Sequence, residues 1–142
     1  METISYQHIV LPMSVLALFT FLILVMLFKS RFRALSKGKV AVAFYKTYVG
    51  EDEPEESRIL SRHLSNLFEA PVLFYVVCLA ALTIQLSSLF FHLLAWSYVV
   101  VRLVHAYIHL GSNKVPYRLA AYFTGWIVLL AMWTTLVYEV LS

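Results

Sequence analysis

The sequence has little of several residue types, and each shortage excludes a class of protein. A single cysteine, Cys78, excludes an internal disulfide, and a lone thiol inside an apolar run is usually inert core. Only four glycines occur in 142 residues, so low complexity does not explain the composition. Hydrophobic residues make up 61% of the chain and the mean hydropathy is +0.79, whereas ordinary soluble domains are roughly 45–50% apolar. The composition therefore indicates one integral membrane domain.

Four apolar segments are each long enough to cross a bilayer, which takes about 20 residues of helix. The segments lack the alternation of β-strands and are too long for the strands of a barrel, so we expect helices. The predicted fold is all-α, an integral membrane four-helix bundle. It forms a single domain over 1–142, with spans at about 9–28, 62–86, 89–110 and 117–141 and a long loop at 29–57.

The placement of lysine and arginine predicts how the chain is oriented. All eleven of these residues fall in the 29–57 loop, near the 111–116 turn, or in the adjoining helix ends. Under the positive-inside rule, the loop faces the cytoplasm and both termini lie outside it. The formal charge of +3 therefore reflects topology, and we expect membrane lipid but no nucleic acid as a partner. The first apolar run lacks a basic segment before it, so it is interpreted as a retained span.

Polar residues recur at helical spacing, and hence on one face, in three of the spans. They are Arg58, Arg62, Asn66 and Glu69 in the second span, Arg102, His105 and His109 in the third, and Arg118 and Tyr122 in the fourth. Cations that face one cavity repel each other unless an anion lies among them, and arginine forks bind carboxylates bidentately. The pattern therefore predicts a site for a small ligand with more than one carboxylate.

Arg102 is the most deeply placed cation, about 12 Å from the end of its helix at 1.5 Å per residue. Burying its charge costs several kcal/mol unless it is paired. Glu69 is the only carboxylate deep enough in the spans, so we expect a structural ion pair between Glu69 and Arg102. His105 and His109 could ligate a metal, but no third ligand lies clearly on their face, and no metal site is predicted. His63 is interpreted as an interfacial or packing residue.

Three motifs together resemble the MAPEG family, the membrane-associated proteins in eicosanoid and glutathione metabolism. They are R-x-x-x-N-x-x-E-x-P at 62–71, R-x-x-H at 102–105 and P-x-R-x-x-x-Y at 116–122. The resemblance covers essentially the whole chain. Known members are homotrimers of four-helix subunits that bind glutathione between neighbouring subunits near the cytoplasmic side. Glutathione carries two carboxylates and one ammonium, which agrees with the ligand that the residues predict.

The resemblance also implies roles for individual residues. Arg118 would stabilise the glutathione thiolate and Tyr122 would bond the sulfur or the peptide, so these two are the predicted catalytic residues. An apolar electrophile or a lipid hydroperoxide would arrive from the bilayer as the second substrate. The predicted glutathione contacts are Arg31 or Arg33 from the neighbouring subunit's first helix, and Arg62, Asn66, Glu69, His105 and His109.

The chain departs from the pattern of the family's prostaglandin synthase at four places. His109 stands where that enzyme has tyrosine, Leu119 replaces a serine proposed to act on the thiol, Ser65 replaces a basic residue, and Pro71 comes closer to Glu69. These departures argue against prostaglandin synthesis and leave open another anion as the ligand. Two alternatives remain: a non-catalytic lipid- or ligand-binding protein of the same fold, and a small transporter that uses Glu69 as its intramembrane carboxylate. The short chain would suit a bacterial member in the inner (cell) membrane.

Overall fold

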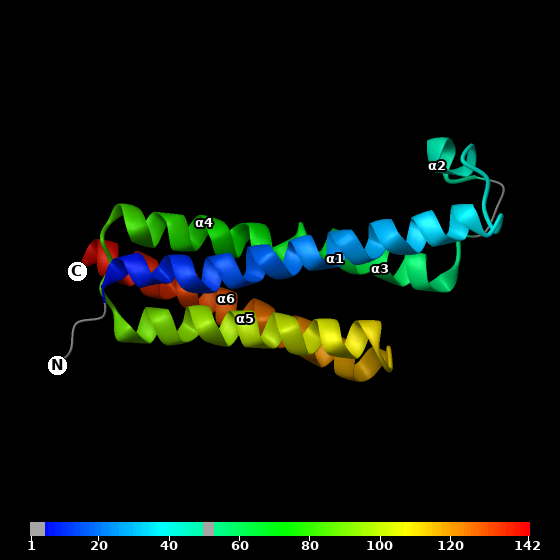
Figure 1. The fold of residues 1–142 in the computed structure, drawn as a ribbon. Helices are drawn as coiled ribbons and strands as arrows, with labels where there is room; N and C mark the ends of the chain where they lie inside the picture. The colour runs from blue at the N-terminus through cyan, green and yellow to red at the C-terminus, as the bar shows by residue number, and fades with distance from the viewer. Residues whose placement is uncertain (1–4, 50–52) are drawn as a thin grey trace.

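Apolar runs of membrane-spanning length dominate the chain, and they form long helices that lie side by side (Figure 1). The computed structural model describes residues 5–49 and 53–142, and every regular element within these ranges is a helix. Four helical segments are long and apolar enough to cross a membrane. The all-α prediction with four membrane-capable helices is therefore confirmed. Residues 50–52 of the predicted loop lie outside the described residues.

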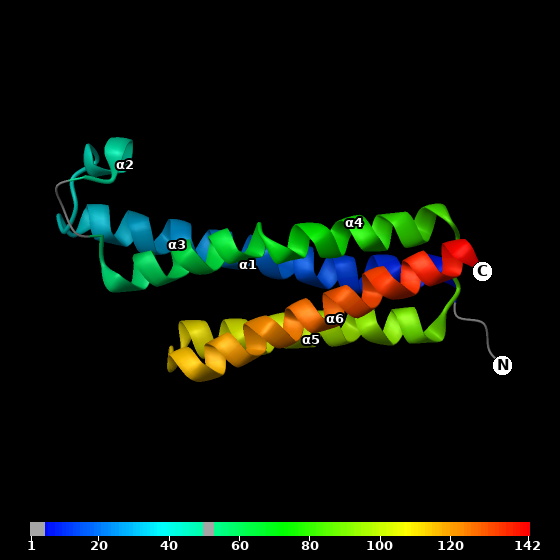
Figure 2. The same cartoon turned by 180° about the vertical axis from the view of Figure 1, so that it is seen from behind.

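The four membrane-capable segments run alternately up and down the bundle, and α3 and α4 are two parts of the second one. In chain order they are η1 (Tyr6–Ile9), α1 (Val10–Ser36), α2 (Phe44–Thr47), α3 (Glu55–Leu67), α4 (Ala70–Thr83), α5 (Leu89–Leu110) and α6 (Val115–Leu141). The beginning of η1, the C-terminus and the α4–α5 turn lie at one end, which we name the terminal end. The α2 segment and the α5–α6 turn lie at the other, which we name the loop end, and both views show this arrangement (Figure 2).

The first helix is longer than its apolar run. It was predicted to end near residue 28, but α1 continues to Ser36. The extension packs against α3, where the buried hydroxyls of Ser30 and Ser57 are 2.7 Å apart and hydrogen-bonded. Arg31 Nε lies 2.8 Å from Glu53 Oε1 at the same end. Basic residues that were assigned to a loop thus continue the helix, because a polar partner surface on the second span faces them.

The second span begins at Glu55, earlier than the predicted residue 62. Pro54 precedes the helix with φ −51°, and Glu55 and Glu56 stand in the first turn. A proline fits this position because the first N–H groups of a helix have no internal partner. Carboxylates there are stabilised by the positive end of the helix dipole.

The same span is broken between α3 and α4. Pro71 lacks an N–H, so the carbonyl of Leu67 receives no helical hydrogen bond from it. Glu69 takes φ −100° and ψ −101° as the residue before α4. The carbonyl of Asn66 turns to α5, where Arg102 Nη2 donates to it at 2.9 Å. The same carbonyl accepts a longer hydrogen bond of 3.4 Å from the N–H of Glu69, so at the break it bonds both to the main chain and to a buried guanidinium.

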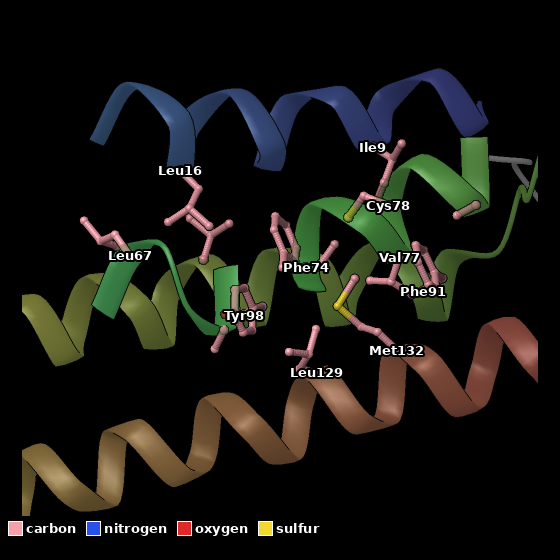
Figure 3. Packing of buried hydrophobic residues seen from close by; sticks show 14 of the residues in the cluster. Ile9, Leu16, Leu67, Phe74, Val77, Cys78, Phe91, Tyr98, Leu129 and Met132 are labelled. Atoms are coloured by element: carbon pink, nitrogen blue, oxygen red, sulfur yellow. The ribbon is translucent and has the colours of Figure 1, made fainter. Parts of the chain in front are cut away.

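Apolar side chains from α1, α3, α4, α5 and α6 form one core along the bundle, and Figure 3 shows part of it. The rings of Phe74 and Tyr98 stack with their centroids 4.6 Å apart. Met132 and Cys78 are fully buried beside them. Because lipid tails are as apolar as these side chains, close packing rather than escape from lipid holds such helices together. Large apolar residues such as Phe21 and Ile127 remain exposed on the outer face, as a bilayer environment requires.

The orientation in the membrane is a prediction that single cysteines can test. Cys78 is fully buried, so it should give little background with a membrane-impermeant maleimide. We expect a cysteine at Lys39, in the exposed 37–43 segment, to be labelled only after cells are permeabilised. A cysteine at Ser87, in the exposed α4–α5 turn, should be labelled in intact cells. The opposite pattern would invert the orientation.

Candidate functional site

A polar pocket of about 440 Å³ lies between α3, α5 and α6, close to the break in the second span. Its volume falls within the range of about 300–1,000 Å³ that is usual for small-molecule sites. The structure brings seven predicted site residues into this pocket, together with two positions at which the chain departs from the family pattern. The lining consists of Arg62, Ser65, Asn66, Glu69, His105, His109, Arg118, Leu119 and Tyr122.

The position of Arg118 depends on the tight turn between α5 and α6. Asn113 has φ 47° in that turn, a left-handed conformation that asparagine tolerates better than most residues. Its side-chain Oδ1 accepts a hydrogen bond of 2.7 Å from Arg118 Nη1. The guanidinium is half-buried and is directed along the pocket wall by a neutral partner. Its positive charge therefore remains available to an anion.

His105 is fixed from the opposite wall of the pocket. Its Nδ1 lies 3.2 Å from the main-chain carbonyl oxygen of Arg118. A carbonyl can only accept, so this contact assigns the proton to Nδ1 and leaves Nε2 with a lone pair. The ring centroids of His105 and Tyr122 are 5.9 Å apart, and the Arg102 guanidinium carbon lies 6.0 Å from the centre of the Tyr122 ring. Tyr122 is thus held between a histidine and a cation.

The expected ion pair between Glu69 and Arg102 is not formed in this structure. Both residues are described, and no nitrogen of Arg102 lies within 4.0 Å of the Glu69 carboxylate. Arg102 is 1% exposed and donates to the carbonyl of Asn66, while Glu69 is exposed at the pocket. The reason is the helix break, which turns the carbonyl of Asn66 towards the buried guanidinium. Glu69 therefore contributes its negative charge to the pocket.

The two arginines of α1 lie outside this pocket in the single subunit. Arg31 pairs with Glu53, and its guanidinium carbon lies 5.2 Å and 5.6 Å from the ring centres of Tyr45 and Tyr48. Burial, followed by the charge of Glu53, raises the pKa of Tyr45 above its ordinary value, so its hydroxyl stays neutral beside the cation. Arg33 is more exposed and pairs with a glutamate in the first turn of α3 at 3.4 Å.

The sequence interpretation missed a contact made by His63. This residue is fully buried, and its ring lies 5.8 Å from that of His105 and 5.2 Å from that of His109. A signal was present, because Leu60, His63 and Leu67 are spaced by three and four and form the buried stripe of α3. A histidine between two leucines of a buried stripe, at the depth of His105, indicates a polar partner there.

These features define a multi-pass integral membrane protein of four helices with a cation-rich polar pocket near one end. The chain matches the model of the MAPEG family over residues 9–138, which is nearly its whole length, and it belongs to that family. It is therefore a membrane protein of the glutathione- and eicosanoid-metabolism type. Members of the family generally use glutathione and are generally oligomeric. No curated protein and no solved structure matches the chain significantly.

Proposed function

We propose that the protein is a glutathione-dependent membrane transferase or peroxidase that acts on an apolar electrophile or a lipid hydroperoxide. The observation that carries this proposal is the convergence of cations, imidazoles, an amide, a carboxylate and a phenol on one pocket of about 440 Å³. The convergence takes residues from α3, the helix break, α5 and α6, so it is not a property of a single helix face.

The charges of the pocket are complementary to those of glutathione. Arg62 and Arg118 supply two cations for its two carboxylates, or one for a carboxylate and one for the sulfur. Glu69 supplies the negative charge that its ammonium requires, and the Asn66 side chain can bond a peptide group. A ligand with carboxylates alone would leave Glu69 facing like charge.

We further propose a homotrimer in which α1 of the neighbouring subunit completes the pocket. Arg33 is the better candidate for this contact, because its side chain is 57% exposed and its glutamate partner is 3.4 Å away. Arg31 is 24% exposed and is held by a 2.8 Å ion pair and two tyrosine rings. Recruiting Arg31 would require breaking these contacts first.

The proposed chemistry begins with the thiol of glutathione. A free thiol has a pKa of about 8.5 and is mostly protonated at neutral pH. The Arg118 guanidinium would favour the thiolate, which is the nucleophile, and Tyr122 would donate a hydrogen bond to it. In the transferase reaction the sulfur bonds to the electrophilic carbon as the bond from that carbon to its leaving group breaks. In the peroxidase reaction the sulfur attacks one oxygen of the hydroperoxide, the O–O bond breaks and the lipid alcohol leaves. A second glutathione then reduces the sulfenic acid to the disulfide, and water is released.

Ultraviolet difference absorbance of the purified protein tests this proposal directly. Titration with glutathione at neutral pH in detergent should give a saturable thiolate band. S-Methylglutathione, which has no thiol, should compete for the pocket without giving the band. Absence of the band, with no glutathione binding by calorimetry, would contradict the proposal.

A second candidate function is non-catalytic lipid or ligand binding, and one observation favours it. An apolar cavity of about 290 Å³ lies between α1 and the broken second span, lined by residues such as Leu24, Phe68 and Tyr75. It could hold an acyl chain without any chemistry. Lipid that co-purifies tightly, in a protein that gives no thiolate band, would favour this function over catalysis.

A further inference from the structure

Three histidine rings meet against the inner wall of the polar pocket. We name His63, His105 and His109 the histidine cluster. Their ring centroids form a triangle with sides of 5.8, 5.2 and 5.8 Å, and none of the three residues is more than 3% exposed. His105 and His109 line the pocket, whereas His63 lies behind them on α3.

The cluster has polar atoms without partners. Both ring nitrogens of His63, Nε2 of His105, Nδ1 of His109 and Nε of Arg102 are buried and make no hydrogen bond among the described residues. Buried polar groups are nearly always bonded to protein or ordered water. A neutral imidazole carries one donor and one acceptor, so each ring can take part in a chain of hydrogen bonds. Five such atoms on three neighbouring rings and one guanidinium are more than an apolar packing contact accounts for, so the cluster is a polar element of the bundle.

The surroundings of the cluster favour passage of a proton over its storage. Arg62 on α3, Arg102 on α5 and Arg118 on α6 are the cations within electrostatic reach of its rings. Tyr122 faces His105 from α6, and α1 contributes the apolar ring of Phe19, 6.2 Å from His63. A proton on the histidine cluster lies near positive charge from three helices. This charge repels the proton, so the cluster would pass it to solvent and not hold it.

We propose that the histidine cluster is a proton relay that connects the pocket to the loop end of the bundle. The inference rests on the proposed thiol chemistry. When the bound thiol ionises, the S–H bond breaks, its electron pair stays on sulfur, and the proton bonds to Nε2 of His105. His105 releases this proton from the same nitrogen, because Nδ1 stays bonded to the carbonyl of Arg118, and His63 and His109 pass it towards solvent. His109 lies one helical turn closer to the loop end than His105, which gives the relay its direction.

His63 is the residue to change, because it does not line the pocket and so should not contact the ligand. We expect His63→Gln to bind glutathione normally and to reach the full thiolate band, but about tenfold or more slowly in stopped-flow absorbance. Positioned proton transfer typically contributes a hundredfold or more to rates. The solvent deuterium isotope effect on the band's appearance should rise, because proton transfer becomes limiting.

His92→Gln is the matched control. His92 is also buried and has an unbonded ring nitrogen, but it lies in the first turn of α5, at the terminal end. The relay requires wild-type kinetics in this variant. Slowing at both positions to the same degree would show a general effect of removing buried histidines and would overturn the assignment.

His63→Phe separates a relay from a packing role. Phenylalanine keeps a ring of similar shape and removes two unbonded nitrogens, so thermal stability should stay equal or rise. The relay requires slow thiolate formation in this stable variant. Wild-type kinetics with an unchanged isotope effect in both His63 variants, or a lost band amplitude in both, would overturn the relay. A wild-type protein without any thiolate band would instead overturn the proposed function, and the relay with it.

Discussion

Replacing Arg118 with alanine should remove the thiolate band and reduce turnover by at least about a hundredfold, the loss typical of deleting one preorganised donor to a developing negative charge. The fold should survive, because the side chain is half-buried and bonds only to the Asn113 side chain. His105 donates its hydrogen bond to the main-chain carbonyl of Arg118, and an alanine at this position keeps that carbonyl. Turnover and difference absorbance in the same detergent preparation measure both effects.

Asn113→Gly gives the matched control for the position of Arg118. Glycine adopts the φ of 47° at residue 113 without strain, so this variant loses only the contact between Oδ1 and the guanidinium. We expect a loss of several-fold in turnover, between wild type and Arg118→Ala. Arg118→Lys should also be impaired, because an ammonium keeps the charge without the planar fork. Unchanged turnover in Arg118→Ala would remove Arg118 from the mechanism.

The lengths of the apolar runs were enough to predict four membrane-spanning helices, because a bilayer imposes a minimum length on such a helix and the length of each run is visible in the sequence. The ends of the helices were harder to predict. The extension of α1 to Ser36 depends on contacts with α3, including the hydrogen bond between Ser30 and Ser57. These residues are far apart in the sequence, and nothing local to the basic segment distinguishes a helix from a loop.

The residues of the pocket could be predicted because they repeat every three or four positions on three helices and lie at one depth. What surrounds them could not. Pro71 allowed a kink, but the backbone at Glu69 and the direction of the Asn66 carbonyl follow from how the broken span packs on α5. We expected a carboxylate as the partner of Arg102. That prediction was wrong, because the observed partner is a main-chain carbonyl.

The histidine cluster shows a second limit of reasoning from spacing. His105 and His109 share a face of α5, so their proximity was expected. His63 lies beside them because α3 packs against α5 at that depth. The periodicity of a single helix carries no information about such packing. Its place in the buried stripe of α3 was visible, but its partners were not.

Glu69→Gln should weaken glutathione binding by about tenfold or more, since hydrogen bonds to charged groups contribute about 1.5–3 kcal/mol. The structure directs the Glu69 carboxylate to the pocket instead of to Arg102, so its proposed partner is the ammonium of the ligand. The decisive comparison uses a glutathione analogue that lacks the amino group. Calorimetry should show that this analogue binds wild type and Glu69→Gln with nearly equal affinity.

Glu139→Gln makes the same change of charge on an exposed residue near the C-terminus and should leave both affinities unaltered. An equal loss for glutathione and for the analogue would mean that Glu69 shapes the pocket without contacting the ammonium. Proton-coupled uptake into sealed vesicles that disappears in Glu69→Gln would support transport instead. Glu69 is the one negative side chain among the described residues that line the pocket, so the ammonium of the ligand has one place to bind. Comparing glutathione with the analogue that lacks the amino group tests whether Glu69 is that place.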